Sequence, residues 1–215
     1  MKKILLPTPS SLADAVILAN GDLPAHSIPF SILRNSKYIV CCDGAIDKLA
    51  PTGIEPQAIV GDCDSLSKKN REKYADIIHR IEEQDTNDLT KSVGFCVEQG
   101  FRNIIILGAT GKREDHTIAN ISLLADYTDY VESICMISDY GVFNAIKEDT
   151  KFESIGKQQT SLFCITPTRI TSLGLKYPIE DRLFTNWWQA TLNEAETNEF
   201  SIETEDKIIV FRAFS

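Results

Sequence analysis

Residues 58–64 have the sequence Ala-Ile-Val-Gly-Asp-Cys-Asp, an apolar run that ends in two aspartates. Such a continuous apolar run predicts a short β-strand buried on both faces. Similar runs recur through the first two-thirds of the chain, at residues 15–18, 38–41, 77–78, 104–107 and 134–137. Because strands buried on both faces are typical of parallel sheets covered by helices, the runs predict an α/β fold.

Two helical patterns lie between the predicted strands. The first begins near Thr86 or Asn87 and ends at Gly100, with apolar side chains at 89, 93, 96 and 97 on one face. The second begins near Asp115, with an apolar stripe at 118, 121 and 124. Alternating strands and helices predict a parallel-sheet, Rossmann-like N-terminal domain over residues 1–145, with helices on both faces.

The last third of the chain has a different pattern of residue types. It holds short segments rich in Thr, Ser and Phe, a turn region at Gly174 and Pro178, and a final apolar run at 207–211. These features predict a small antiparallel β-sandwich domain over residues 150–215. Residues 194–206 carry six acids and no base, which indicates a solvated hairpin or loop.

Composition excludes several classes of protein. The 215 residues carry a formal net charge of −9, which argues against a nucleic-acid partner and favours a cationic or metal-bridged small molecule. The N-terminus lacks a signal-peptide apolar region and no window is apolar enough to span a membrane, so we expect a cytoplasmic protein without a membrane partner. The six cysteines lie mostly in apolar runs and predict small buried side chains rather than disulfides or a zinc site.

Aspartates follow the predicted strands at the points where the strands end. In an open parallel sheet these carboxyl ends share one edge, and ligands bind in the crevice outside them. Any single aspartate there is better explained as a turn or cap residue, but together they indicate an acidic rim. The aspartates concerned are Asp43, Asp62, Asp64, Asp85, Asp88 and Asp115.

Clustered carboxylates require a positive partner. Oxygen ligands of this kind suit Mg²⁺, which commonly completes its coordination with water and substrate phosphates. In an extended chain Asp62 and Asp64 lie on the same side, where they can share one metal ion.

Residues 108–116, Gly-Ala-Thr-Gly-Lys-Arg-Glu-Asp-His, form a second candidate site between a predicted strand and helix. Glycines there allow backbone N–H groups and a helix N-terminus to face a phosphate, with Lys112 and Arg113 adding charge. The spacing is not that of a Walker A loop. A loop that only turns the chain explains these residues equally well, and His116 alone is typical of a helix start.

Aromatic residues of the C-terminal part form a third candidate site. Tyr177 lies in a turn region, and Trp187 and Trp188 are adjacent. If the two tryptophans lie on a strand they face opposite sides, so at most one belongs to the core. The other interpretation is a stacking wall for a flat or cationic ligand.

Several segments, taken in order, resemble the thiamine pyrophosphokinase family. The Gly-Asp-x-Asp-Ser-Leu element at 61–66 and the Gly-x-Arg-x-Asp-His element at 111–116 are specific in combination. Matching stretches also occur at 42–45, 84–91, 174–177 and 185–186. Three positions depart from the usual family pattern, namely Asn87, Lys112 and Tyr177, where threonine, glycine and tryptophan are common.

The resemblance implies an enzyme that transfers the diphosphoryl group of ATP to the hydroxyl of thiamine with Mg²⁺, acting as a homodimer. It implies an acidic catalytic centre of Asp43, Asp62, Asp64, Gln84, Asp88 and Asp115, with Asp62, Asp64 and Asp88 as metal ligands. It implies ATP contacts from Gly108, Gly111, Lys112, Arg113 and His116, and thiamine contacts from Tyr177, Thr185, Asn186 and Trp187.

Two alternatives from other classes remain open at this point. One is a phosphohydrolase in which Asp62 is a carboxylate nucleophile and Asp64 an acid. The other is a non-catalytic nucleotide or thiamine sensor that uses the same pocket without turnover.

Overall fold

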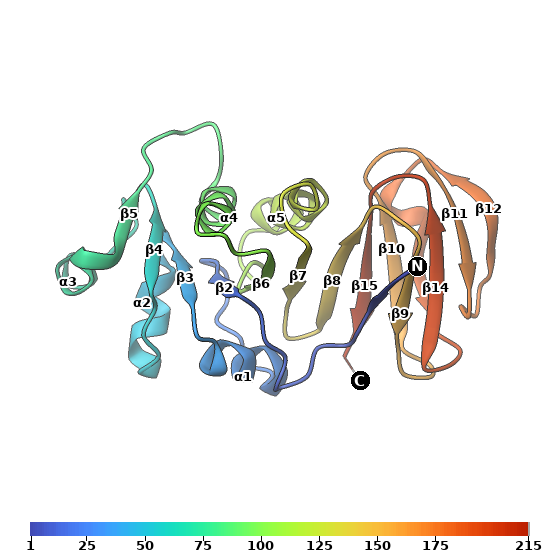
Figure 1. Ribbon diagram of the computed structural model, residues 1–215, viewed down its shortest axis with the longest axis horizontal. Coiled ribbons are helices and arrows are strands. Elements are labelled where there is room, and N and C mark those ends of the chain that lie inside the picture. The colour runs from blue at the N-terminus through green and yellow to red at the C-terminus, as the bar shows by residue number, and fades with distance from the viewer. Residues whose placement is uncertain (215) are drawn as a thin grey trace.

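Two sheets organise the chain (Figure 1). The computed structural model describes residues 1–214. The larger sheet has ten strands in the order β13-β10-β15-β8-β7-β6-β2-β3-β4-β5, and the smaller has five in the order β1-β9-β14-β11-β12. Among the described residues no helix is long and apolar enough to cross a membrane.

The parallel half of the large sheet follows the predicted apolar runs. Strands β2, β3 and β4 are buried along their whole length, which confirms the prediction from continuous hydrophobicity. They pair in parallel with one another and with the strands on either side. The parallel strands are β2 (Ala15–Leu18), β3 (Ile39–Cys42), β4 (Ala58–Gly61), β5 (Ile78–Arg80), β6 (Asn103–Leu107) and β7 (Ser133–Ile137).

Helices cover both faces of this parallel region, as predicted. Apolar residues of α4 (Asp88–Glu98) and α5 (Glu114–Tyr127) pack on one face of the sheet. Residues of α1 (Ser27–Asn35) and α2 (Ile46–Leu49) pack on the other. The shorter helical segments are η1 (Asp43–Ala45), η2 (Ala50–Thr52), α3 (Lys68–Lys73) and η3 (Ala75–Ile77).

The two predicted helices are present with the expected boundaries. Asn87 caps α4 by accepting the Thr90 N–H at 2.9 Å, and Gly100 follows the helix with φ of +84°. In α5 the predicted apolar stripe is only partly correct. Leu124 is buried and Ile121 is partly buried against the core, but Ile118, in the second turn of the helix, is 53% exposed and does not belong to that core.

Antiparallel strands extend the large sheet into the C-terminal part of the chain. β8 (Gly141–Ile146) pairs antiparallel with β7, and β15 (Ile208–Ala213), β10 (Gln159–Cys164) and β13 (Ala190–Glu194) follow. The smaller sheet packs against this extension through a shared apolar core. The α/β fold followed by a β-sandwich is therefore confirmed. The smaller sheet consists of β1 (Lys2–Ile4), β9 (Thr150–Glu153), β14 (Glu199–Thr204), β11 (Thr168–Leu173) and β12 (Ile179–Phe184).

The prediction of a solvated loop at 194–206 was wrong for its second half. This segment contains β14, which lies between β9 and β11 in the smaller sheet. Phe200 and Ile202 alternate along it and are buried. Their period-two pattern marks a half-buried strand, and the surrounding glutamates obscured it in the sequence.

The cysteines behave as small apolar side chains. All six are free; five are buried and Cys135 is half-buried. This confirms the sequence interpretation.

A buried arginine joins the N-terminal segment to the β-sandwich. The Arg212 side chain is fully buried, and burial lowers its pKa to about 10. Its guanidinium donates to the backbone oxygens of Leu5 at 3.1 Å and Glu153 at 2.5 Å, and to the Asn144 Oδ1 at 2.8 Å. It thereby fixes the chain between β1, which pairs with β9, and β2 in the large sheet.

Replacing Arg212 with methionine is expected to lower the free energy of unfolding by roughly 3–5 kcal/mol, because the buried Asn144 Oδ1 and two part-buried carbonyls lose their donor, at about 1–3 kcal/mol for each group left unsatisfied. Urea denaturation measures the change. Arg169→Met removes an exposed arginine paired with Asp181 and should change stability by less than about 0.5 kcal/mol. A similar loss in both variants would contradict the assigned role of Arg212.

Candidate active site

A cleft of about 400 Å³ opens at the carboxyl ends of the parallel strands. All the described residues that line it lie between Ala19 and Asn120, so the β-sandwich contributes none. This is the edge at which the sequence predicted the acidic rim, and the position where open α/β sheets bind ligands. The carboxylates line it together with Lys91, which lies beside Asp88, and a second group of basic side chains comes from residues 112–116.

Asp43 is the most deeply buried acid of the cleft. It follows β3 in η1 with φ of +38°, and it is only 3% exposed. Its Oδ2 accepts the Ser65 N–H at 3.1 Å, whereas its Oδ1 is buried without a hydrogen-bond partner among the described residues. Gly61 is necessary beside it, because a Cβ there would lie 2.9 Å from the Asp43 Cβ and 3.1 Å from the Asp88 Oδ1.

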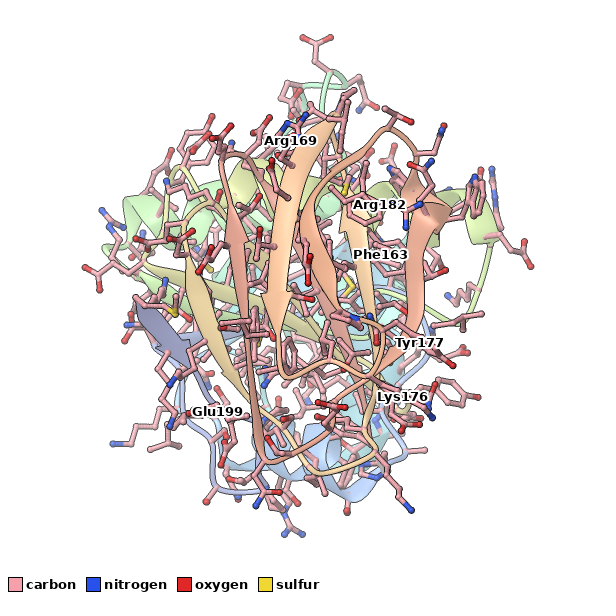
Figure 2. The ribbon with its side chains drawn as sticks, turned by 90° about the vertical axis from the view of Figure 1, so that its right-hand side faces the viewer. Phe163, Arg169, Lys176, Tyr177, Arg182 and Glu199 are labelled. Atoms are coloured by element: carbon pink, nitrogen blue, oxygen red, sulfur yellow. The ribbon has the colours of Figure 1, made fainter. Side chains whose placement is uncertain are left out.

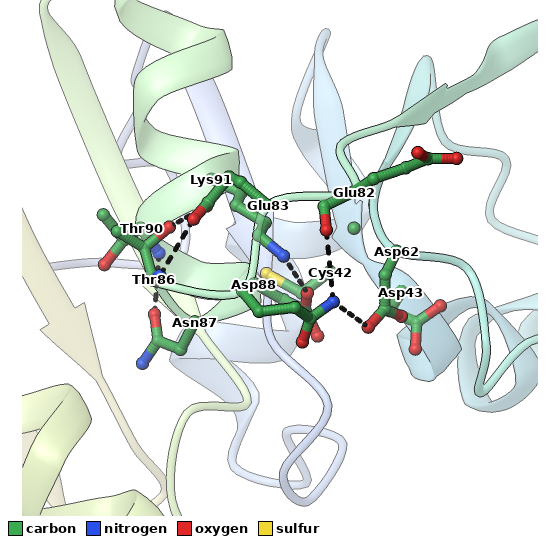
Figure 3. Close-up of polar contacts among 12 residues, drawn as sticks. Cys42, Asp43, Asp62, Glu82, Glu83, Thr86, Asn87, Asp88, Thr90 and Lys91 are labelled. Atoms are coloured by element: carbon green, nitrogen blue, oxygen red, sulfur yellow. Dashed lines mark hydrogen bonds and ion pairs between the residues drawn. The ribbon is translucent and has the colours of Figure 1, made fainter.

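Asp62 and Asp88 complete the acidic wall (Figure 3). The Asp62 carboxylate accepts the Asp64 N–H at 3.0 Å and the Gln84 Nε2 at 3.4 Å, and these bonds hold the pKa of Asp62 below its usual range. Burial, followed by the charges of Asp43 and Asp62, raises the pKa of Asp88. The nearby Lys91 ammonium, 3.9 Å from Asp88, offsets part of this effect.

The structure brings together only some of the residues predicted for the acidic rim and the catalytic centre, and Asp85 is not among those that line the cleft. Asp43, Asp62, Gln84 and Asp88 line the cleft, whereas Asp64 and Asp115 do not. Across residues 1–214, no three acidic, histidine or cysteine side chains converge closely enough to hold a metal ion alone. Asp115 forms an exposed ion pair with Arg113 at 2.5 Å.

The predicted extended geometry of Asp62 and Asp64 was wrong. Cys63 between them has φ of +67°, in the left-handed region, so the chain turns directly after β4. The hydrogen bond from the Asp64 N–H to Asp62 closes this turn, and Asp64 is exposed. The two carboxylates therefore do not share one side of the chain.

The basic wall is formed by the turn before α5. Lys112, Arg113 and His116 line the cleft, whereas Gly108 and Gly111 shape the turn behind it with φ of +65° and +91°. At Gly111 a side chain would overlap Asp22, with a Cβ only 2.9 Å from the Asp22 Cβ. The first turns of α5 face the cleft through His116 and Thr117, so the positive end of the helix dipole lies beside it.

The aromatic candidates lie in the β-sandwich, away from this cleft. Tyr177 is 61% exposed beside Lys176 (Figure 2). Trp187 packs edge-on against Phe163 with ring centroids 6.1 Å apart. Both tryptophans lie in the helical turn η4 (Trp187–Gln189) rather than on a strand, and neither is a core residue, which agrees with the expectation that at most one would be.

The Thr185-Asn186 pair supports the η4 turn. The backbone N–H groups of Thr185 and Asn186 donate to the Gln189 Oε1 at 2.8 and 3.0 Å, and the Asn186 side chain completes a capping box. These bonds explain why the polar pair precedes two tryptophans. They also hold Trp187 at the surface, where it is 36% exposed.

Sequence reasoning missed several lining residues. Asn20 and Gly21 lie just after the carboxyl end of β2, at the edge where open parallel sheets bind ligands. A search for aspartates alone does not find them. Lys91 lies one turn after Asp88 in α4, and Asn120 one turn after His116 in α5. Helical spacing from the two predicted helix starts was the signal that could have found them.

Comparison with known proteins matches two successive parts of the chain to two family models. Residues 30–137 match the family model for the thiamin pyrophosphokinase catalytic domain, and residues 141–211 match the model for the substrate-binding domain. The chain belongs to the thiamin pyrophosphokinase family. Thiamin pyrophosphokinase 1 of Caenorhabditis elegans is 31% identical over 216 residues of alignment. The alignment covers 93% of this chain and 88% of that protein.

Solved thiamin pyrophosphokinase structures share the fold. The enzyme from Candida albicans superposes with a TM-score of 0.81 at 20% identity, covering all of this chain and 93% of that one. A family protein from Enterococcus faecalis gives 0.81 at 19% identity, covering 94% of this chain and 100% of that one. Family membership makes the chain a kinase-type transferase, and the phosphohydrolase and sensor alternatives are not favoured.

Most residues that line the cleft lie within the segment that matches the thiamin pyrophosphokinase catalytic domain. Asp43, Asp62, Asp88 and Lys112 fall within residues 30–137, and Tyr177 falls within the substrate-binding match at 141–211. Asn20 and Gly21 line the cleft from outside either match.

Proposed function

We propose that this chain transfers the diphosphoryl group of ATP to the hydroxyl of thiamine, releasing AMP and thiamine diphosphate in the cytoplasm. The observation that supports this proposal is one cleft lined by both carboxylates and cationic side chains. A polyphosphate bound there can meet lysine and arginine directly and meet the carboxylates through a cation.

The residues of the acidic wall fit Mg²⁺. Asp43 Oδ1 is buried and lacks a partner, and burial followed by the neighbouring carboxylates raises the pKa of Asp88, so a cation would relieve an existing electrostatic cost. Mg²⁺ usually takes one or two carboxylates and completes its shell with phosphate oxygens and water. We propose Asp62 and Asp88 as the ligands, and we retain Asp64 on the family resemblance.

The chain's own groups would act mainly by positioning. Lys112 and Arg113 would hold the ATP phosphates, with Gly108, Gly111 and His116 shaping that wall of the cleft. Bound Mg²⁺ would neutralise charge on the transferring oxygens.

The acidic wall would also handle the proton of thiamine. The hydroxyl oxygen would attack the β-phosphorus, and the bond from that phosphorus to the oxygen of the α-phosphate would break as AMP leaves. The carboxylate of Asp43, which lines the cleft, is the acceptor that we assign to the hydroxyl proton. Gln84 would hold Asp62 in position through its hydrogen bond.

Thiamine needs contacts that the cleft does not offer. Its thiazolium is a permanent cation and its pyrimidine is flat, and both favour aromatic faces. Exposed aromatic side chains occur in the β-sandwich, at Tyr177 and Trp187, with Thr185 and Asn186 beside them. We therefore propose a catalytic domain over residues 1–145, a thiamine-binding and dimerisation domain over 150–215, and a homodimer in which the two domains meet across the subunit boundary.

Incubation of the protein with thiamine, ATP and MgCl₂ tests this function. We expect AMP and thiamine diphosphate to form in equal amounts, and neither to form when thiamine or Mg²⁺ is omitted. Release of inorganic phosphate without thiamine would instead indicate a phosphohydrolase. Binding of both substrates without any product would indicate a sensor.

A further inference from the structure

Lys48 supports the basic wall from behind the cleft. It lies in α2, the second short helical segment after β3. Its side chain does not line the cleft itself. Its Nζ donates to the backbone oxygen of Asn20 at 3.4 Å and to that of Gly21. Asn20 and Gly21 do line the cleft, so Lys48 is positioned to act through them.

The turn that Lys48 contacts is closely fitted to the basic wall. The Gly21 N–H donates to the Gly108 oxygen at 2.6 Å, and the Asp22 N–H donates to the Thr110 oxygen at 2.9 Å. Any side chain at Gly21 would overlap these backbone oxygens. The turns after β2 and β6 therefore form one unit, and Lys48 is attached to it.

Asn20 connects the two lysines. Its side-chain Oδ1 accepts the Lys112 Nζ at 3.3 Å, while its backbone oxygen accepts the Lys48 Nζ. Both ammonium groups thus approach one residue at the edge of the cleft. Lys112 faces the cleft, where an anion would meet it, and Lys48 does not.

The charged groups that face Lys48 from the elements packed around it are Lys112, in the turn before α5, and Asp22, in the turn after β2. Burial and the hydrogen bond and charge of Lys112 lower the pKa of Lys48 to about 8, and Asp22 opposes this shift. A neutral Lys48 amine can donate two hydrogen bonds, to the Asn20 and Gly21 carbonyl oxygens, and can accept one, from the Lys112 ammonium. A charged Lys48 has no acceptor to offer Lys112.

We propose that Lys48 is a positioning residue that holds the Asn20–Gly21 turn for the phosphate chain of the nucleotide and takes up a proton when that anion binds at Lys112. The inference rests on the proposed function, because it takes a nucleotide as the anion. Phosphate beside Lys112 would offset the repulsion between the two lysines, so the protonated form of Lys48 would stay the stable one at alkaline pH, where the free protein loses this proton.

The sign of the pH dependence follows from this linkage. A group whose pKa rises on binding takes up protons, so nucleotide affinity falls as pH rises above the pKa of the free protein. With a free pKa of about 8 and an ordinary bound value, we expect the KM for ATP to rise about tenfold from pH 7 to pH 9, with kcat changed by less than about twofold.

Calorimetric titration with Mg·ATP in the absence of thiamine tests the inference, using buffers of different ionisation enthalpy. We expect uptake of roughly 0.5–0.8 proton per site at pH 8.5 and about 0.1 at pH 7. Phosphate groups are already ionised at pH 8.5 and contribute little. AMP, which lacks the phosphate chain, should give smaller uptake than ATP.

Three variants make the result specific. Lys48→Arg keeps the charge and the donors but does not titrate, so it should bind Mg·ATP without proton uptake. Lys48→Met should also lose the uptake and raise the KM for ATP about tenfold through loss of the turn's support. Lys69→Met removes an exposed lysine of α3 and should behave as wild type.

The outcomes distinguish failure of the proposed function from failure of the role of Lys48. If Mg·ATP does not bind the wild-type protein, the proposed function is wrong. If it binds, and Lys48→Met and Lys48→Arg retain the wild-type uptake at pH 8.5, the role of Lys48 is wrong while the proposed function stands.

Discussion

Replacing Asp88 with asparagine is expected to lower the turnover for diphosphoryl transfer by about a thousandfold. Asp88 begins α4, lines the cleft and is influenced by the charges of Asp43 and Asp62, and we propose it as a metal ligand together with Asp62. Asparagine keeps the size and one oxygen but removes the charge that would attract Mg²⁺. Raising the MgCl₂ concentration should restore only part of the rate, which initial-rate measurements over a range of Mg²⁺ concentrations would show.

The same change should stabilise the metal-free protein. Burial and two neighbouring carboxylates raise the pKa of Asp88, so its charged form is unfavourable in the folded state. A carboxyl with a raised pKa favours folding when protonated and loses that contribution as pH rises through its folded pKa. Asp88→Asn should therefore raise the melting temperature in EDTA more at pH 7 than at pH 4.

An exposed acid provides the control for net charge. Asp76→Asn, in η3, removes one negative charge at a solvent-exposed position away from the cleft. It should leave both turnover and melting temperature close to wild type. If Asp88→Asn turned over thiamine at a normal rate in limiting Mg²⁺, the carboxylate would have no part in holding the metal.

The sequence was informative where one local rule decides the structure. Continuous apolar runs identify β2, β3 and β4, because only burial on both faces tolerates them. Because the carboxyl ends of parallel strands share one edge of the sheet, the residues that follow these strands are expected there, as Asp43, Asp62 and Asp88 are. Asn87 marks the start of α4 because its side chain caps the helix.

Prediction failed where long-range or backbone geometry decides the structure. The left-handed Cys63 turns Asp64 out of the cleft, and nothing in the residue types signals that conformation. β1 pairs with β9, which lies more than half the chain further on, and such a pairing depends on tertiary packing. Lys48 escaped notice for a similar reason, since its role appears only when Asn20 and Lys112 are brought beside it.

The second large effect concerns how the two domains cooperate. The cleft is lined only by residues up to Asn120 among those described, whereas the exposed Tyr177 lies in the β-sandwich. If each active site combines the cleft of one subunit with the aromatic wall of its partner, Asp88→Asn and Tyr177→Ala damage different halves of a site. Each variant alone should be nearly inactive. Tyr177→Ala should fold normally, because the side chain is 61% exposed.

Mixing the two inactive variants should therefore restore activity. With random pairing, about half the dimers are mixed, and each mixed dimer holds one intact and one doubly damaged site. Activity should return to about a quarter of wild type after subunit exchange, which native mass spectrometry of tagged subunits would follow.

A matched mixture shows whether such recovery reflects sharing between subunits. Asp88→Asn and Asp43→Asn both alter the same cleft, so every site of their mixed dimers carries one lesion, and no recovery is expected. Recovery in this control as well would show that some process other than site sharing restores activity. Absence of recovery with Tyr177→Ala, despite demonstrated exchange, would place cleft and aromatic wall within one chain. That result would require the β-sandwich to reach the cleft of its own subunit, although none of its described residues lines that cleft in the present arrangement.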